Sequence, residues 1–287
     1  MFMMDWVTGK EIAEKIADDL KKKILFSKQK LILKIFLVGD DPASQIYVKK
    51  KQEFCRQVGI ETQVEKFTAE VSFNHLKKKL LLANQSKILT AILIQLPLPQ
   101  KLSEKKVLAL IDPKKDADCL HPKNFGLFCQ YGFAQAPVLP ATALAVMKIL
   151  KKKKIKLSGC QVTIVGNSNI VGKPLAMMLS EAGATVVLCQ KKTKNLAQHT
   201  LMADIVITAT GVKGLIKKNM LKKGVGIIDI GITREGKKVF GDVDLKEIDD
   251  LEGWITPVPG GVGPVTVAVL AENVWKLSLK NQRGKIF

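Results

Sequence analysis

Arginine is scarce in this chain, although the chain is strongly basic. Its 287 residues include 46 basic and 26 acidic ones, for a formal net charge of +20, yet only Arg56, Arg234 and Arg283 are arginines. Arginine makes most bidentate contacts to phosphates and base edges, and the lysines form short scattered runs instead of one basic stripe. A nucleic-acid-binding protein is therefore the weaker alternative. A lysine-rich solvated surface that attracts small anions is the better interpretation.

Long apolar runs and metal-ligand spacings are also absent from the sequence. No stretch reaches the roughly 18 apolar residues of a membrane span, and no apolar signal segment follows the N-terminus. The five cysteines form no CxxC pair and no zinc spacing, which predicts reduced thiols. We therefore expect a cytoplasmic protein with no membrane partner, no nucleic-acid partner and no bound metal.

Alternating strand and helix patterns predict an α/β protein with two domains. The first part has apolar or half-polar strand patterns at 31–38, 60–67 and 88–96, and helical patterns at 8–23, 44–58, 73–84 and 103–110. The second part has strand patterns at 161–165, 185–189, 205–210 and 226–230, with a short hairpin arm at 239–242. Pro137 and Pro140 mark a boundary, so the domains are predicted at 1–139 and 140–265. The amphipathic segment 266–287 is expected to return to the first domain as a helix.

Three polar features of the first part are candidates for a ligand site. Tyr47 and Lys51 are four residues apart and therefore share a face of the predicted helix 44–58, just after a strand end where open α/β sheets bind ligands. On this spacing alone a solvated lysine face is the commoner explanation. Gln95 ends an apolar strand, and it must either meet a ligand or make a structural hydrogen bond. Asp118 lies in a polar loop, 112–122, whose carboxylates could bind a cationic or amide-bearing ligand, although capping of backbone donors is the commoner fate.

A glycine-rich turn follows the strand pattern 161–165. Gly166 permits a tight turn, and amides at the start of the next helix can hold a phosphate. The motif is not a strict GxGxxG, and Pro174 stands where a P-loop needs a hydroxyl. The next strand exits into Gln190-Lys191-Lys192, where an NAD site would have an acid for the ribose. Two lysines without a carboxylate favour NADP, although a solvated lysine pair is the alternative.

The run 254–264 is so dense in glycine and proline that we expect no helix there. Such a backbone has a fixed shape and can approach a flat ligand closely. It completes a series of six motifs: Ser44-Gln-Ile-Tyr47-Val-x-x-Lys51, Gln95-Leu-Pro-Leu-Pro, Lys115-Asp-Ala-Asp118, Val165-Gly-x-Ser-x-Ile-Val-Gly-Lys-Pro174, Asp229-Ile-Gly-Ile and Pro257-Val-Pro-Gly-Gly-Val-Gly-Pro264. In this order, nearly from end to end, the motifs resemble the bifunctional methylenetetrahydrofolate dehydrogenase/cyclohydrolase family.

The resemblance implies a multifunctional oxidoreductase and hydrolase of folate one-carbon metabolism, which supplies purine biosynthesis. A hydride leaves 5,10-methylenetetrahydrofolate for NADP⁺, and water opens the methenyl product to 10-formyltetrahydrofolate. It also implies an N-terminal catalytic folate domain, a Rossmann-like NADP-binding domain with the active cleft between them, and a homodimer. The implied catalytic residues are Lys51 for proton transfer, Gln95 to hold that lysine, Tyr47 beside the pterin and Asp118 on the pterin edge. The implied cofactor residues are Gly166, Asn167, Ser168, Ile170, Lys191, Thr210 and Ile232, and Pro259, Gly260 and Gly261 join Tyr47 and Asp118 as substrate residues.

The chain departs from the family pattern at three places. Cys119 replaces the glycine that follows Asp118 in the family, and the block 140–145 lacks the family's cysteine, second proline and glycine. Asn167 and the pair Gln190-Lys191 replace an arginine and a His-Ser pair on the cofactor side. A cyclohydrolase with weak or NAD-linked dehydrogenase activity is therefore the alternative. A short-chain dehydrogenase is excluded, because its Tyr-x-x-x-Lys motif follows the nucleotide turn, whereas Tyr47 precedes Gly166.

Overall fold

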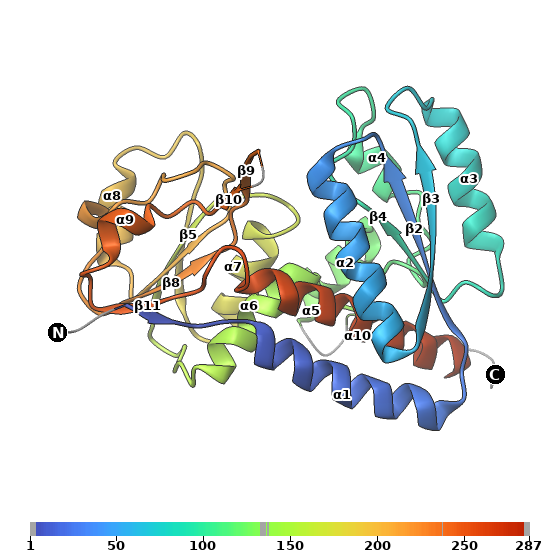
Figure 1. The fold of residues 1–287 in the computed structure, drawn as a ribbon, viewed down its shortest axis with the longest axis horizontal. Helices are drawn as coiled ribbons and strands as arrows, with labels where there is room; N and C mark the ends of the chain where they lie inside the picture. Colours follow the sequence, from blue (N-terminus) through green and yellow to red (C-terminus); the bar gives the residue numbers. More distant parts are fainter. Residues whose placement is uncertain (1–3, 133–135, 137, 237, 284–287) are drawn as a thin grey trace. The chain divides into compact units, whose positions relative to one another are not determined.

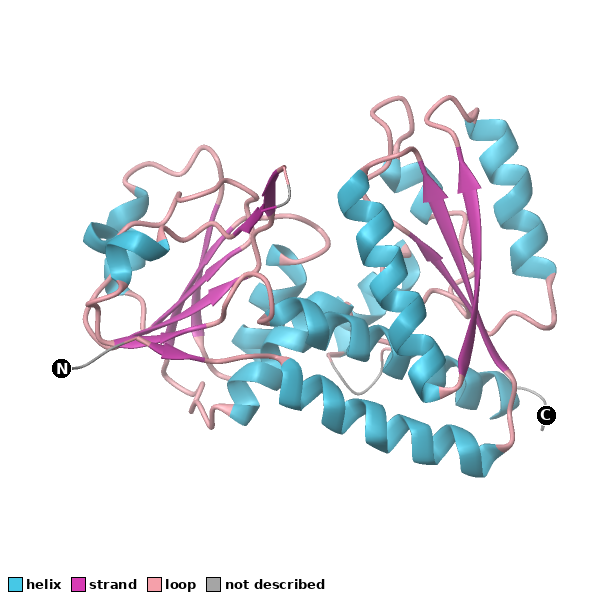
Figure 2. Cartoon of the chain, in the orientation of Figure 1, coloured by secondary structure: helices cyan, strands magenta, loops and turns pink. Residues whose placement is uncertain are grey.

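The computed structural model describes residues 4–132, 136, 138–236 and 238–283. Pro137 lies outside them. The chain divides into two compact units (Figures 1 and 2), each containing its own parallel sheet. Unit 1 comprises Met1–Ala13 and Thr142–Thr266, and unit 2 comprises Glu14–Ala141 and Val267–Phe287. No helix in the described part of the chain is long and apolar enough to cross a membrane.

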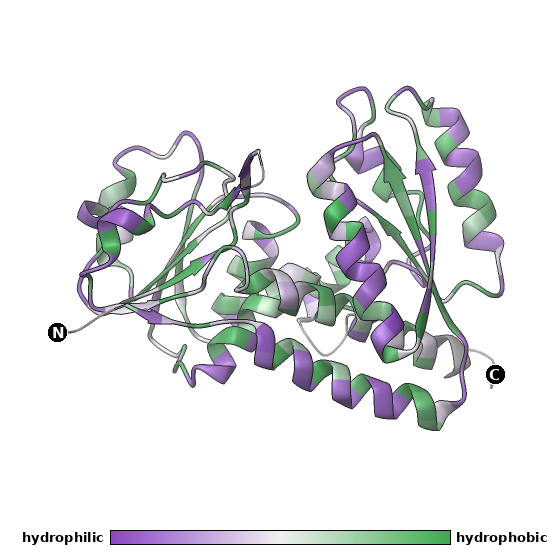
Figure 3. Cartoon of the chain, in the orientation of Figure 1, coloured by the Kyte–Doolittle hydropathy of each residue, from purple (hydrophilic) through white to green (hydrophobic). Residues whose placement is uncertain are grey.

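Unit 2 is built on a three-stranded parallel sheet. The strand order is β3 (Ile60–Phe67), β2 (Leu31–Val38) and β4 (Ala91–Ile94). Figure 3 shows β2 and β4 as hydrophobic and the edge strand β3 as largely hydrophilic. The helices of this unit are α2 (Pro42–Val58), α3 (Phe73–Gln85), α4 (Glu104–Leu108) and α5 (Pro122–Tyr131), with most of α1 (Lys10–Ser27) and of α10 (Val262–Arg283). The sheet order places β2, the strand that leads into α2, in the centre.

Helix α2 has strong signals at both ends. Asp41 caps its start by accepting a hydrogen bond from the Ser44 amide at 2.8 Å, and Pro42 occupies the first turn, where its missing N–H is harmless. Gly59, with a φ of 89°, ends the helix in the left-handed region. The helix starts two residues earlier than the predicted 44–58, because its cap is Asp41.

Unit 1 is built on a six-stranded sheet whose described strand pairs are all parallel. The strand order is β1 (Asp5–Trp6), β11 (Gly253–Ile255), β8 (Val225–Asp229), β7 (Ile205–Thr208), β5 (Gln161–Val165) and β6 (Thr185–Cys189). The remaining elements are α6 (Ala141–Lys152), α7 (Gly172–Glu181), α8 (Leu196–Met202), the 3₁₀ turn η1 (Lys218–Met220), the hairpin β9 (Thr233–Glu235) and β10 (Lys238–Phe240), and α9 (Leu245–Ile248). This arrangement puts the end of β7 and the end of β8 side by side.

The short strands β1 and β11 were not predicted, and β1 ties the N-terminal segment to the sheet of unit 1. Asp5 and Trp6 pair with Trp254 and Ile255, and the described residues up to Ala13 group with unit 1 by their contacts. The prediction of no helix over 254–264 is wrong at its end, because α10 already begins at Val262. Pro264 is compatible with that start, since proline is tolerated in the first turn of a helix.

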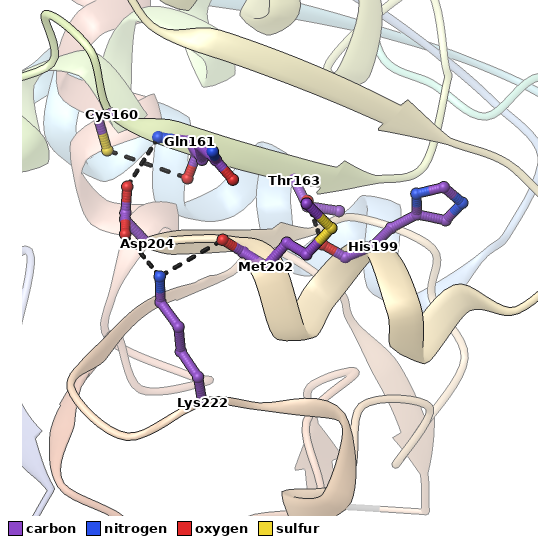
Figure 4. Close-up of polar contacts among 7 residues, drawn as sticks. All are labelled: Cys160, Gln161, Thr163, His199, Met202, Asp204 and Lys222. Carbon is purple, nitrogen blue, oxygen red and sulfur yellow. Dashed lines mark hydrogen bonds and ion pairs between the residues drawn. The ribbon is translucent and has the colours of Figure 1, made fainter.

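The amino ends of β5 and β7 are joined by an exposed polar cluster (Figure 4). Asp204 accepts a hydrogen bond from the Gln161 amide at 2.8 Å and one from Lys222 Nζ at 2.6 Å. Lys222 and the Gln161 amide hold the pKa of Asp204 below its usual value. The cluster lies at the edge of the sheet opposite to the strand ends at which parallel α/β sheets bind ligands, so we assign it a structural role.

Candidate active site and cofactor site

Lys51 and Gln95 form a buried pair in unit 2. Lys51 is only 9% exposed, whereas its neighbours Lys49 and Lys50 are exposed. Lys51 Nζ donates a hydrogen bond to Gln95 Oε1 at 2.7 Å. The explanation of a solvated lysine face is therefore wrong for Lys51. The sequence left two interpretations of Gln95, a ligand contact or a structural hydrogen bond. In the structure, its side-chain amide makes a hydrogen bond to a side chain of another element, Lys51 of α2.

The Gln95 amide is held in a single orientation. Its Nε2 donates to the Leu96 carbonyl oxygen at 2.6 Å, which leaves Oε1 facing Lys51. Its backbone N–H donates to the Phe36 carbonyl oxygen at 2.9 Å and so continues the pairing of β4 with β2. The polar end of this buried strand is thus fixed by the sheet, and it presents a neutral acceptor to the lysine.

The charges of Lys51 and Asp118 are coupled. Burial lowers the pKa of Lys51, and the negative charge of Asp118 opposes this shift. Burial also raises the pKa of Asp118 to about 6, opposed by Lys51 and by the Ala141 amide that donates to Asp118 Oδ1 at 2.9 Å. A lower pKa makes the neutral form of a lysine, which can accept a proton, easier to reach. Tyr47, on the same helix, is half-buried.

The loop that carries Asp118 is organised by Asp116, a residue that the sequence did not single out. Asp116 is 1% exposed and accepts hydrogen bonds from the amides of Asp118, Leu120 and His121 and from Asn124 Nδ2, at 2.9 to 3.3 Å. The commoner fate of such loop carboxylates, capping backbone donors, is therefore that of Asp116. Only the contacts of the folded loop reveal this, because both aspartates stand in the same polar segment.

Two further contacts define the geometry around Asp118. Cys119, which stands where the family has glycine, is fully buried and has a φ of 56°, in the left-handed region that favours glycine. On the other side, Asn273 Nδ2 from α10 donates to the carbonyl oxygens of Ala117 at 3.0 Å and Leu139 at 2.8 Å. The C-terminal helix thus holds the backbone next to Asp118.

The glycine-rich turn in unit 1 is packed too closely for side chains at its glycines. A Cβ added to Gly172 would collide with the Gly166 carbonyl oxygen, and Gly166 has a φ of 123°. Helix α7 begins here without a side-chain cap, while Ser168 Oγ accepts from the Val171 amide at 3.1 Å. These glycines, with an uncapped helix start, fit the pyrophosphate of a dinucleotide. Ile170 is half-buried at the same turn.

The first residues after β6 carry no acidic side chain: Gln190 is neutral, and Lys191 and Lys192 are basic. Asn167 Nδ2 donates to Gln190 Oε1 at 3.1 Å, so the two residues that replace the family's arginine and histidine pair with each other. Lys191 and Lys192 follow and are exposed. Along the same sheet edge, Thr210 donates from its amide and its hydroxyl to Asp242, and Ile232 is 37% exposed. The predicted cofactor residues therefore gather at the carboxyl ends of β5, β6, β7 and β8.

The predicted substrate residues Pro259, Gly260 and Gly261 also belong to unit 1. The Gly261 amide donates to the Pro257 carbonyl oxygen at 2.8 Å, and the Gly9 amide donates to the Gly260 carbonyl oxygen at 2.9 Å. Pro259 is exposed at the tip of this turn. A Cβ on Gly9 would collide with the Gly261 carbonyl oxygen, so the two backbones are packed directly against each other.

Comparison with known proteins identifies the family. Residues 7–118 match the model of the tetrahydrofolate dehydrogenase/cyclohydrolase catalytic domain, and residues 140–282 match its NAD(P)-binding domain. The chain belongs to the tetrahydrofolate dehydrogenase/cyclohydrolase family. Its predicted α/β fold, with a catalytic and a Rossmann-like domain, and its predicted bifunctional dehydrogenase and cyclohydrolase activity in one-carbon metabolism are thereby confirmed.

Individual members of the tetrahydrofolate dehydrogenase/cyclohydrolase family resemble the chain over its whole length. The bifunctional protein FolD of Campylobacter jejuni is 44% identical over 97% of this chain and 99% of its own length. A crystal structure of the C. jejuni enzyme has a TM-score of 0.90, at 41% identity, covering 96% of this chain and 99% of that one. The Trypanosoma brucei enzyme, solved with NADP and an inhibitor, has a TM-score of 0.93, at 30% identity, covering 99% and 100%.

Proposed function

We propose that Lys51, Gln95, Asp118 and Tyr47 form the catalytic group of this dehydrogenase/cyclohydrolase and that its nucleotide is NADP⁺. The observation that carries the proposal is the buried hydrogen bond between Lys51 Nζ and Gln95 Oε1, beside an Asp118 whose pKa is raised to about 6. A lysine that is buried, held by a neutral amide and lowered in pKa has the properties of a general base.

In the oxidation step, a hydride leaves the bridging methylene carbon of the folate. When bound, NADP⁺ would supply the nicotinamide that accepts this hydride. The product is a methenyl cation between N5 and N10. A neutral Lys51 next to this cation adds no like charge, whereas a protonated one would be repelled. The Asp118 carboxylate accepts hydrogen bonds from the donor-rich edge of the pterin.

In the hydrolysis step, neutral Lys51 takes a proton from water as its oxygen bonds to the methenyl carbon. The bond from that carbon to N5 then breaks as the new hydroxyl group loses its proton to solvent and becomes the formyl C=O, and N5 receives the proton that Lys51 returns. The one-carbon unit remains on N10 as a formyl group, so the product is 10-formyltetrahydrofolate and one water has been consumed. Gln95 keeps Lys51 Nζ in place and contributes no charge.

The pH dependence of hydrolysis tests this role of Lys51. The charge of Asp118 raises the pKa of Lys51 against the lowering by burial, so Asp118→Asn should lower that pKa further. If neutral Lys51 is the base, the rising limb of the pH–rate profile should move to lower pH in the variant, although the rate itself falls because a pterin contact is lost. The measurement is methenyltetrahydrofolate hydrolysis from pH 5 to 9, after subtraction of the uncatalysed rate. A limb that stays in place or moves to higher pH contradicts the assignment.

The proposed homodimer forms through the β6 edge of unit 1. Strand β6 ends the sheet and exposes Val187 and Leu188 at 39% and 37%, and the nearby helix α8 exposes Met202 at 61%. An apolar strand edge of this kind invites pairing with another strand. We expect the mass in sedimentation equilibrium to be that of two chains, and Leu188→Lys to shift it to one. A monomeric wild type at micromolar concentration would refute the dimer.

A further inference from the structure

Two buried carboxylates in unit 1 have no part in the mechanism above. Asp229 ends β8 and is 3% exposed, and Asp242 follows β10 and is 0% exposed. Removing a carboxylate from water is costly unless donors replace the lost hydration. The donors that surround these two groups therefore show what the carboxylates organise.

Asp242 gathers the donors of one loop. Its Oδ2 accepts hydrogen bonds from Thr208 Oγ1 at 2.7 Å, from the Thr210 amide at 2.7 Å and from Thr210 Oγ1 at 2.8 Å. Its Oδ1 accepts from the Val212 amide at 3.0 Å. Within the described parts of the chain, every hydrogen bond to this carboxylate comes from residues 208–212, the loop that leaves the end of β7.

Asp229 gathers the donors of the neighbouring turn. Its Oδ1 accepts from the amides of Gly231 at 3.0 Å and Asp242 at 3.1 Å, and its Oδ2 accepts from the Val243 amide at 3.0 Å. A Cβ on Gly231 would strike the Asp242 carboxylate, and one on Gly241 would strike the Asp229 carboxylate. The two glycines thus let both carboxylates lie directly against the backbone that they bind.

Together the two carboxylates connect three segments at the carboxyl edge of the sheet: the loop 208–212, the turn 229–231 and the segment 240–243. The first of these contains Thr210, and the second leads directly into Ile232, two of the proposed cofactor residues. We propose that Asp242, supported by Asp229, is a positioning residue that holds Thr210 and the turn before Ile232 in the conformation that receives the nicotinamide dinucleotide. This inference rests on the proposed function, and Asp242 acts through the loops without touching the cofactor.

The experiment compares Asp242→Asn with Asp204→Asn. Asparagine keeps the shape of aspartate, but it replaces one acceptor oxygen with a donor, which must then face a donor from residues 208–212. Asp204 provides a control in the same unit, because it also accepts one hydrogen bond from a backbone amide and one from a side chain. It lies at the amino ends of the strands (Figure 4), opposite to the carboxyl ends where Asp242 lies. For each variant, KM for NADP⁺ is measured in the oxidation reaction, and hydrolysis of methenyltetrahydrofolate is measured without nucleotide.

We expect Asp242→Asn to raise KM for NADP⁺ by about 10-fold or more, the size of effect of a lost charged hydrogen bond. Hydrolysis should stay within about twofold of the wild type, because Lys51, Gln95 and Asp118 belong to unit 2 and the hydrolysis step uses no nucleotide. Asp204→Asn should leave both quantities unchanged. Equal losses of oxidation and hydrolysis in Asp242→Asn, or an unchanged KM, would overturn the positioning role.

A second variant keeps the proposal testable if Asp242→Asn does not fold. Thr208→Val removes one hydroxyl donor to Asp242 with little change of volume, and it should raise KM for NADP⁺ severalfold with hydrolysis retained. An unchanged KM in this variant overturns the proposal. Failure of the proposed cofactor is seen separately, in the wild type, as hydrolysis without reduction of NADP⁺. The same KM comparison with NAD⁺ then decides whether Asp242 positions the loop.

Discussion

Replacing Lys51 with methionine is expected to lower the rate of methenyltetrahydrofolate hydrolysis by about 10²–10⁴-fold, the usual contribution of a general acid or base. The variant loses the Nζ atom that donates to Gln95 Oε1, and with it the group that accepts the proton of the attacking water. Methionine occupies a similar volume and needs no hydrogen-bond partner when it is buried, so the fold should be preserved. The rate is followed from the disappearance of the methenyl compound.

Lys50→Met is the matched control for this prediction, because Lys50 is the exposed neighbour on the same helix. Its hydrolysis rate should remain within about twofold of the wild type, as is usual for surface substitutions away from a site. NADP⁺ should raise the melting temperature of Lys51→Met by as much as it raises that of the wild type, since the cofactor residues belong to unit 1. Hydrolysis by Lys51→Met at the wild-type rate would refute the assignment of Lys51.

The second large effect is expected on the cofactor side. The double replacement Lys191→Ala and Lys192→Ala should raise KM for NADP⁺ by about 10- to 100-fold, because one or two charged contacts to the 2′-phosphate are lost. KM for NAD⁺, which lacks that phosphate, should change little. Asn167 cannot replace the lysines, since it is neutral and its side-chain amide pairs with Gln190.

The control for the cofactor prediction is Lys156→Ala, another exposed lysine of unit 1. This variant should leave both KM values unchanged, which separates a local contact from the general attraction of a basic surface. Because the local effect involves a phosphate, raising the salt concentration should weaken NADP⁺ binding more than NAD⁺ binding. If the double variant loses affinity for both nucleotides equally, the lysines do not recognise the 2′-phosphate. A wild type that prefers NAD⁺ would favour the alternative of an NAD-linked dehydrogenase.

The parts of the fold that the sequence predicted well are those with local signals. The apolar run of β2, the turn after it and Gly59 at the end of α2 placed Tyr47 and Lys51 on one helix after a central strand. Similarly, the strand pattern 161–165 and the glycines at 166 and 172 placed the nucleotide turn. In each case periodicity and turn residues act within a few positions of the chain.

The features that the sequence did not predict depend on distant contacts. Strand β1 has two residues and exists only because it pairs with β11, about 250 positions away. The helices α5 and α8 are short, and neither has the long apolar periodicity that makes a helix recognisable. For the same reason, the start of α10 at Val262 was hidden behind the glycines and prolines that precede it.

The candidate site was predicted unevenly. Gln95 stood out as a polar residue at the end of an apolar strand, and its pairing with Lys51 is what such a position suggests. Asp229 ends the apolar strand β8 in the same way, so that signal could also have identified it as an organising residue. Asp116 and Asp242 offered no comparable signal, because each is recognised only by the amides and hydroxyls that the folded loops direct at it.

The most direct measurement follows the wild-type enzyme with 5,10-methylenetetrahydrofolate and either NADP⁺ or NAD⁺ at equal concentrations. The expected result is reduction of NADP⁺, faster than that of NAD⁺, with 10-formyltetrahydrofolate formed in an amount equal to the NADPH. Under the same conditions, Lys51→Met should produce NADPH without matching 10-formyltetrahydrofolate, or neither product. Formation of 10-formyltetrahydrofolate by Lys51→Met at the wild-type rate, or a strong preference of the wild type for NAD⁺, would contradict the account.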